Sequence, residues 1–183
     1  MENGQMFDVE KCRITHYPEP VLAKKAEPVK KVTDDIRRLA EKMIDIMVET
    51  KGVGLAGPQA GVPLRIFVAS PTGSKQDAKV YINPTINPSG AIESIEEGCL
   101  SIPGIYGKIR RYNKCSVTAT GLDGKEFTEE GQGLLARIFQ HEVDHLDGVI
   151  VADRMGTVAK IAARGRLKDL RDKYEQKQNK GDS

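Results

Sequence analysis

The residues best suited to chemistry lie in one short segment, Gln140–His145, with the sequence Q-H-E-V-D-H. On a helix, His141 and His145 would lie one turn apart on the same face, where two ring nitrogens can bind one metal ion. Glu142 lies beside that face, near enough to accept a proton from metal-bound water. The chain has only three histidines, and two of them occur here at ligand spacing. This coincidence disfavours the alternative of two surface histidines, whereas His16 stands alone in a proline-rich segment.

A catalytic metal site usually has three protein ligands, so a third ligand is needed. No histidine follows His145, and the acidic residues downstream do not differ from an ordinary charged surface. Upstream, Cys99 lies within Glu97–Ser101, and a thiolate is a good ligand for a borderline or soft metal. Spacing alone favours Cys99 only modestly over a buried apolar role, which is the role we expect for Cys12 and Cys115.

A glycine-rich segment, Gly52–Gln59, precedes these residues. It follows a predicted helix rather than a strand, which excludes a dinucleotide-binding fingerprint, and it has no G-K-[ST] sequence. A plain loop remains one interpretation. The chemical alternative is close approach of the backbone to a ligand, with the Gln59 side-chain amide as a hydrogen-bond donor.

The spacing of apolar residues predicts the helices that would position these segments. The first extends from 34 to about 49, with Thr33 as its N-cap. The second, at 132–147, carries the histidines. A third is predicted over 157–176, although Gly165 weakens it.

Strands are predicted between the helices. They cover 64–70, 80–86, 108–122 and 125–129. Asp123-Gly124 indicates a type I′ turn between the last two. Because strands and helices are segregated, the pattern is α+β. We expect a single domain over 1–183, with antiparallel or mixed sheets around a central histidine-bearing helix and a C-terminal helix.

The composition excludes several classes of protein. Hydrophobic residues make up 39% and charged residues 30% of the 183 positions, which excludes a disordered or collagen-like chain. No apolar run approaches the ~20 residues that a membrane helix needs, so no membrane partner is expected. The N-terminus resembles neither a secretory signal nor an Arg-rich transit peptide, and the three cysteines are a sparse set. These features favour a reducing compartment and a cytoplasmic protein, with an organellar protein whose transit segment has been removed as the alternative.

Charge is unevenly distributed along the chain. The net charge is only +2, too small to indicate nucleic-acid binding, and no sequence-specific nucleic-acid partner is expected. Residues 160–183 nevertheless carry eight Lys or Arg against four Asp or Glu. The basic C-terminal helix and tail, about 157–183, is either a solvated helix with a frayed end or a contact for an anionic partner. Charge alone does not decide between them.

Taken together, these segments resemble the peptide deformylase family. The family motifs G-φ-G-φ-A-A-x-Q, E-G-C-φ-S and Q-H-E-φ-D-H, with φ apolar, match Gly52–Gln59, Glu97–Ser101 and Gln140–His145 in that order. The resemblance extends from Pro18–Val29 to about Arg154. Gly57 stands where the family usually has a second alanine, and the missing methyl group should loosen the loop without removing a catalytic group.

The resemblance implies removal of the N-formyl group from the initiator methionine of new proteins, which yields formate and a free amine. The metal ligands that it implies are Cys99, His141 and His145. Glu142 would be the catalytic acid and base, and Gln59 with the Leu100 backbone N–H would stabilise the oxyanion. Gly54 would offer backbone groups to the substrate. The implied metal is iron(II), and zinc, nickel or cobalt could also occupy a Cys/His/His site.

The implied partners are formyl-methionyl nascent peptides, with the ribosome as a candidate anionic partner for the basic C-terminal segment. A methionine side chain needs an apolar slot beside the metal. The residues expected to line this slot are Leu134 and Ile138, with Val53 and Ile95 as weaker candidates. Arg111 is expected to pair with Glu97 and so to brace the loop that carries Cys99.

Two other functions remain open from the sequence. An endopeptidase of the H-E-x-x-H type would need a third ligand downstream of the helix and a cleft for long peptides. A structural zinc module would close all four metal positions with protein, and only Cys12, Cys115 or His16 remain to complete it.

Overall fold

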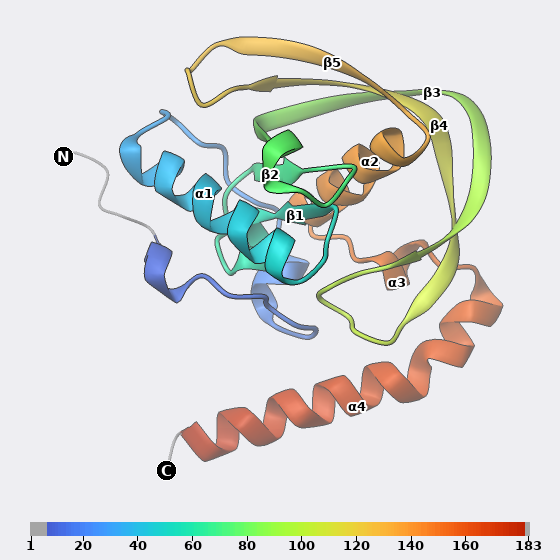
Figure 1. Ribbon diagram of the computed structural model, residues 1–183. Coiled ribbons are helices and arrows are strands. Elements are labelled where there is room, and N and C mark those ends of the chain that lie inside the picture. The colour runs from blue at the N-terminus through green and yellow to red at the C-terminus, as the bar shows by residue number, and fades with distance from the viewer. Residues whose placement is uncertain (1–6, 182–183) are drawn as a thin grey trace.

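The computed structural model describes residues 7–181, so the first six residues and the last two of the predicted basic tail lie outside it (Figure 1). The helices are α1 (Asp34–Glu49), α2 (Leu134–Leu146), α3 (Val151–Arg154) and α4 (Thr157–Gly181). The strands are β1 (Gly54–Ala56), β2 (Ile66–Ala69), β3 (Lys79–Gly98), β4 (Tyr106–Thr120) and β5 (Glu126–Gln132). Short 3₁₀ helices are η1 (Val9–Lys11), η2 (Pro20–Ala23), η3 (Gly57–Ala60) and η4 (Lys75–Asp77).

The strands form one antiparallel sheet in the order β1-β2-β3-β4-β5, so each strand pairs with its neighbours in sequence. The predicted α+β class is confirmed. The choice between antiparallel and mixed pairing is resolved in favour of antiparallel, since the parallel Glu27–Leu64 bridge lies outside the named strands. The long strands β3 and β4 curve around α2, which contacts all five strands (Figure 1).

Strand β3 is much longer than the predicted 80–86, because it continues through Pro88 to Gly98. Beyond Asn83, whose N–H donates to Arg65 O at 2.8 Å, this strand pairs with β4 only. One edge of the strand is therefore free, and proline is tolerated on such an edge. Most residues of this second half are exposed, so it lacks the buried alternation by which a strand is recognised. Strand β1, inside the glycine-rich segment, was also not predicted.

The connection between β4 and β5 is not the predicted type I′ turn. Gly124 N–H donates to Gly121 O, and Gly121 N–H donates to Lys125 O. A type I′ turn needs positive φ at both central residues, but only Gly124 has it, at 79°, and Asp123 does not. Gly124 is therefore the last residue of a four-residue turn that begins at Gly121.

The helices agree more closely with the prediction. Helix α1 has the predicted bounds, and the Thr33 hydroxyl accepts a hydrogen bond from the Ile36 N–H at 3.4 Å. Helix α2 begins at Leu134 rather than 132, because β5 extends to Gln132 and Gly133 turns the chain with φ 58°. The short helix α3 was not predicted, and α4 continues beyond the predicted end at 176.

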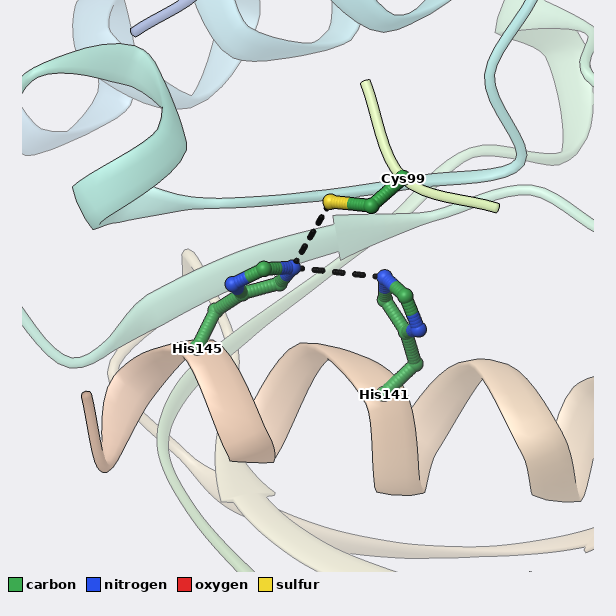
Figure 2. A group of neighbouring side chains, drawn as sticks. All are labelled: Cys99, His141 and His145. Atoms are coloured by element: carbon green, nitrogen blue, oxygen red, sulfur yellow. Dashed lines mark hydrogen bonds between the residues drawn. The ribbon is translucent and has the colours of Figure 1, made fainter. Parts of the chain in front are cut away.

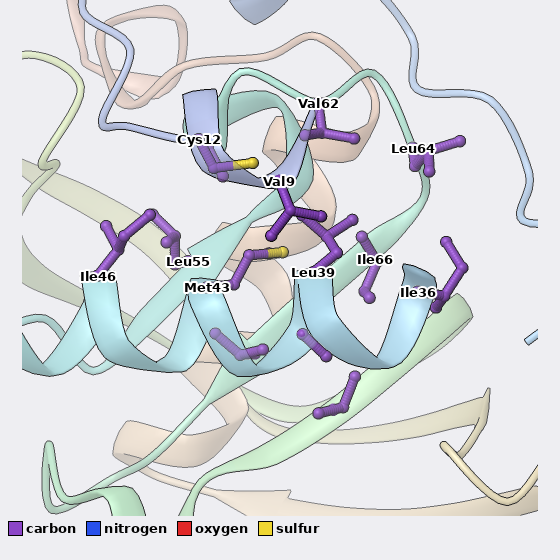
Figure 3. Packing of buried hydrophobic residues seen from close by; sticks show 14 of the residues in the cluster. Val9, Cys12, Ile36, Leu39, Met43, Ile46, Leu55, Val62, Leu64 and Ile66 are labelled. Carbon is purple, nitrogen blue, oxygen red and sulfur yellow. The ribbon is translucent and has the colours of Figure 1, made fainter. Parts of the chain in front are cut away.

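Three clusters of buried side chains hold these elements together. Helix α1 packs its apolar stripe, including Leu39 and Met43, on β1 and β2 (Figure 3). Between the sheet and α2, the Phe67 and Tyr81 rings stack with centroids 4.5 Å apart. A third cluster, centred on Ile102, joins the loop after β3 to α3 and α4. Within residues 7–181, none of the helices has the length and apolar character required to span a membrane.

Candidate metal centre

The three ligands implied by the resemblance converge at one point (Figure 2). Cys99 Sγ lies 3.2 Å from His145 Nε2, which lies 3.2 Å from His141 Nε2, and all three donor atoms are within 4.8 Å of one another. Bonds of ~2.0–2.3 Å in a tetrahedral site place donor atoms roughly 3.3–3.6 Å apart. One sulfur and two ring nitrogens at these separations therefore fit a single divalent ion.

The ligands come from two elements that the sheet and helix hold in place. Both histidines project from α2 at the spacing of one turn, and Cys99 follows directly after the end of β3. Burial raises the pKa of the Cys99 thiol, but the neighbouring His145 and His141 rings lower it well below its usual value. The thiolate, which is the form that binds metals, is thus favoured.

His141 is oriented by a carboxylate behind it. Its Nδ1 lies 3.2 Å from Glu97 Oε2, the arrangement usually found for metal-binding histidines. Burial raises the pKa of Glu97, but hydrogen bonds with His141, Arg111 and Arg137 outweigh burial and lower it to about 2. Glu97 is therefore ionised at neutral pH. No hydrogen-bond partner for the buried His145 Nδ1 is found among residues 7–181.

A buried ionic network supports Glu97. Arg111 Nε donates to Glu97 Oε1 at 2.8 Å, as expected from the sequence, and Arg111 Nη1 donates to Asp144 Oδ2 at 2.9 Å. Arg137 Nη1 donates to Glu97 Oε1 at 2.5 Å. Sequence reasoning missed Arg137 and Asp144. Their positions gave some signal, since Asp144 lies inside the Q-H-E-V-D-H segment and Arg137 lies one helical turn before His141.

Glu142 lies beside the ligands with room for its carboxylate. It is 3% exposed, and its Oε2 atom has no hydrogen-bond partner in the described part of the chain. A side-chain carbon at Gly54 would lie only 2.3 Å from Glu142 Oε1, so this space exists because residue 54 is glycine. Burial raises the pKa of Glu142 to about 7, against the opposing effect of His141 and His145. A carboxyl group with this pKa can both accept and return a proton near neutral pH.

Two hydrogen-bond donors lie close to the thiolate. Gln59 Oε1 accepts from Ala56 N–H at 2.8 Å, which directs Gln59 Nε2 to Cys99 Sγ at 3.3 Å. The Leu100 N–H, in the next residue after Cys99, forms no hydrogen bond within residues 7–181. Gln59 is 2% exposed, so its amide is held within the packed interior, whereas Leu100 is half-buried.

The site opens into a cavity of about 470 Å³. The residues expected at the site that line this cavity are Val53, Gly54, Gln59, Cys99, Leu100, Leu134, Ile138, His141 and Glu142. His145 is 1% exposed and does not line it. Ile95 is 46% exposed and is also absent from the lining. Three residues, Glu96, Glu97 and Gly98, separate Ile95 from Cys99, and all three line the cavity, so Ile95 lies just beyond its edge on β3.

The geometry supports neither an endopeptidase with a downstream third ligand nor a structural zinc module with four protein ligands. Within the described residues, the cluster of potential metal ligands consists of Cys99, His141 and His145, without a downstream acid or histidine. Cys12 and Cys115 are buried in the apolar clusters beside α1 and α2, as expected. An H-E-x-x-H helix completed by an upstream thiolate, with a buried acid at an open cavity, defines a metal-dependent hydrolase.

Comparisons with known proteins identify the family. The model of the polypeptide deformylase family matches residues 11–160. A peptide deformylase from Rhodopirellula baltica is 38% identical over 170 residues, covering 92% of this chain and 85% of the relative. The crystal structure of a plant peptide deformylase superimposes with a TM-score of 0.90 at 35% identity, covering 96% of this chain and 97% of the other. The crystal structure of peptide deformylase from Plasmodium falciparum superimposes with a TM-score of 0.86 at 36% identity, covering 90% of this chain and 98% of the other.

This chain belongs to the polypeptide deformylase family. It is an enzyme that removes the N-formyl group from the N-terminal methionine of newly synthesised polypeptides. The activity depends on a metal, in agreement with the donor set described above.

Proposed function

We propose that deformylation takes place at the cavity end formed by α2 and the loop after β3, with Cys99, His141 and His145 as the metal ligands. The observation that supports this assignment is the convergence of one sulfur and two ring nitrogens beside a buried carboxyl group. Thiolate and imidazole ligands suit iron(II), which we propose as the natural metal, with zinc, nickel or cobalt as substitutes. A bound divalent ion would polarise the formyl carbonyl and lower the pKa of a water molecule toward ~7.

Glu142 would then act as base and acid. It accepts a proton from the attacking water and delivers it to the amine nitrogen when the C–N bond breaks. Formate and a free amino terminus are the products. The raised pKa of Glu142 supports this double role, because the group can be deprotonated for the first step and protonated for the second.

Gln59 Nε2 and the Leu100 backbone N–H would stabilise the negative charge that develops on the formyl oxygen. Leu100 follows Cys99 directly, and Gln59 Nε2 is already directed to Cys99 Sγ, which favours effective oxyanion stabilisation. Removing one such donor costs about 2.7–4 kcal/mol in comparable sites.

The remaining cavity would hold the first residue of the substrate. Leu134 and Ile138 offer an apolar wall one to two turns before His141 on α2, and Val53 lies on the cavity lining as well. Gly54 has no side chain between the strand backbone and the cavity, so its peptide groups can hydrogen-bond to an extended peptide. Ile95 is not part of this proposal because it does not line the cavity.

The direct experiment is formate release from formyl-Met-Ala-Ser by protein loaded anaerobically with iron(II), zinc, nickel or cobalt. We expect formate with iron(II) and none with metal-free protein. The unformylated peptide Met-Ala-Ser serves as the substrate control. Cleavage of an internal peptide bond in a long unformylated peptide would instead indicate an endopeptidase. Tight metal binding without formate release would favour a structural metal module.

We also propose a cytoplasmic enzyme that works at the ribosome. Its substrate is a nascent chain, which emerges from a particle rich in RNA. The exposed basic side chains of α4 support an electrostatic contact with such a polyanion.

A further inference from the structure

Arg137 is a charged residue in a part of the cavity that is otherwise suited to an apolar side chain. It lies on α2 one turn before His141, between Leu134 and Ile138, and all four residues line the same cavity. Only 8% of its surface is exposed. Burying a guanidinium group is costly unless its hydrogen-bonding groups are used, so the position of Arg137 needs an explanation.

One edge of the Arg137 guanidinium is fixed. Its Nη1 donates to Glu97 Oε1 at 2.5 Å and to the Ile109 carbonyl oxygen at 3.3 Å. The planar guanidinium carries five donors, and the other edge comprises Nε and Nη2. Neither atom forms a hydrogen bond within residues 7–181. Neither atom is fully buried, because the fully buried side-chain atoms without a partner belong to other residues. These donors therefore have access to open space, and the cavity is the space that Arg137 lines.

Support of Glu97 does not by itself explain this arginine. Arg111 already donates to both Glu97 oxygens, at 2.8 Å from Nε to Oε1 and 3.0 Å from Nη2 to Oε2. A methionine or leucine at position 137 would leave that pair intact and give the slot a fully apolar wall. The unused donors are what distinguishes arginine from these residues.

We propose that Arg137 is a specificity-determining residue whose free guanidinium edge donates a hydrogen bond to the thioether sulfur of the substrate methionine. The inference rests on the proposed function of this site. A thioether is a weak acceptor, but a charged donor strengthens the bond. A hydrocarbon side chain of the same length would leave the donors unpaired, and enzymes reject such analogues for this reason.

The test compares formyl-Met-Ala-Ser with formyl-norleucine-Ala-Ser, in which a methylene group replaces the sulfur. We expect the wild-type enzyme to prefer the methionine peptide in kcat/KM by about fivefold, the value of one modest hydrogen bond. In Arg137→Leu the ratio should fall to about one. Because both substrates are measured on the same preparation, a change in metal content or folding lowers both rates and leaves the ratio unaffected.

Leu134→Ala is the matched control. Leu134 lines the same cavity from the same helix but has no polar atom, so both substrates should lose rate and the ratio should stay at its wild-type value. The product peptides Met-Ala-Ser and norleucine-Ala-Ser provide a second measurement that needs no turnover. Their dissociation constants, from calorimetry, should differ for the wild type and coincide for Arg137→Leu.

Two results overturn the inference while leaving the proposed function intact. One is equal kcat/KM of the wild-type enzyme for the methionine and norleucine peptides, a measurement that needs no variant. The other is an Arg137→Leu enzyme that keeps the wild-type preference. Absence of formate from both peptides with metal-loaded wild type would instead contradict the proposed function.

Discussion

Cys99 reaches the two histidines from a distant part of the chain, 46 residues before His145. Replacing any of the three proposed ligands by alanine leaves two, which is too few for a stable site. We therefore expect Cys99→Ala, His141→Ala and His145→Ala each to lose the metal and abolish formate release. Metal content by mass spectrometry and formate release check this. The matched controls Cys12→Ser and Cys115→Ser should keep both, and a normal metal content in Cys99→Ala would contradict the coordination set.

A substitution at Glu142 tests whether metal binding and catalysis can be separated, as the proposed mechanism requires. Its carboxylate lies beside the ligand cluster but is not part of it. Glu142→Gln preserves the shape of the side chain and removes its ability to accept a proton. We therefore expect full metal content and a loss of kcat of about 10²- to 10⁴-fold, which is the usual contribution of general acid–base catalysis. A metal-loaded Glu142→Gln enzyme with wild-type kcat would remove this residue from the mechanism.

Cys115 should make the free energy of unfolding depend on pH in the alkaline range. It is fully buried, and burial raises the pKa of its thiol to about 11 from a usual value of 9.0. A raised folded-state pKa contributes stability that is complete below pH 9 and is lost as the pH rises toward 11. We expect wild-type protein to lose up to about 2 kcal/mol more than Cys115→Ala across this window. Urea denaturation at pH 8 and 10.5 measures the difference, and parallel losses in the two proteins would refute it.

At the scale of residues, sequence spacing predicted most of the proposed site. The i, i+4 histidines with an adjacent glutamate indicate a metal site on physical grounds alone, whereas Cys99 required the family resemblance. Ile95 was misplaced because its distance along β3 from Cys99 is visible only once that strand is known to be extended. The role of Arg137 depends on contacts with Glu97 and Ile109, which are distant in sequence and carry no local signal.

At the scale of elements, the glycine-rich segment is more tightly packed than its sequence suggests. Gly57 begins η3, and a side-chain carbon there would lie 2.5 Å from Leu64 O and 2.9 Å from Val62 O. The expected loosening of this loop is therefore not what the structure shows, because neighbouring backbone has closed onto the glycine. Since Gln59 lies in the same short helix, this packing also fixes a proposed oxyanion donor.

We therefore expect Gly57→Ala to lower the free energy of unfolding by about 1–3 kcal/mol, the usual cost of overpacking. Urea denaturation measures this value. Gly165→Ala makes the same exchange inside α4, where nothing lies within 4 Å, and should stabilise the protein by about 0.5–1 kcal/mol. A Gly57→Ala protein as stable as wild type would show that the loop can open to accept the methyl group.

The predictability of the elements follows from burial. Helix α1 was predicted to the residue, because one face is buried and a threonine caps it. The outer half of β3 was not, because it is held by pairing with β4 rather than by buried side chains. Strand β1 is three residues long and is specified by its pairing with β2, which is a tertiary contact.

At the scale of the whole molecule, α4 has two distinct sides. Ala159, Ala163, Leu167 and Leu170 pack on the cluster around Ile102 and Ile105, next to the loop that carries Cys99. Ile161 is 53% exposed because it lies on the opposite side of the helix. Arg171 belongs to the docking side, since its Nη2 donates to the Tyr17 hydroxyl at 2.5 Å. The exposed basic side chains of the outer face include Lys160, Arg164 and Lys168.

This division permits a sharper test of the proposed ribosome contact than truncation alone. Truncation after Val158 removes the basic face together with the apolar side chains that pack on the body. We expect it to leave turnover of short formyl-Met peptides nearly intact and to weaken ribosome binding. Reversing charge at Lys160, Arg164 and Lys168 with glutamate keeps the packing and should weaken binding in the same way.

Binding to ribosomes is measured by co-sedimentation across a salt series, with formate release from formyl-Met-Ala-Ser as the activity control. Contacts with phosphates release counterions, so the wild-type affinity should fall steeply with salt, and the charge-reversed enzyme should show both weaker binding and a shallower slope. Asp169→Lys adds a positive charge to the same helix and should strengthen binding at low salt. If the charge-reversed enzyme folds, turns over short peptides and binds ribosomes as tightly as wild type at every salt concentration, the outer face of α4 is only a solvated surface.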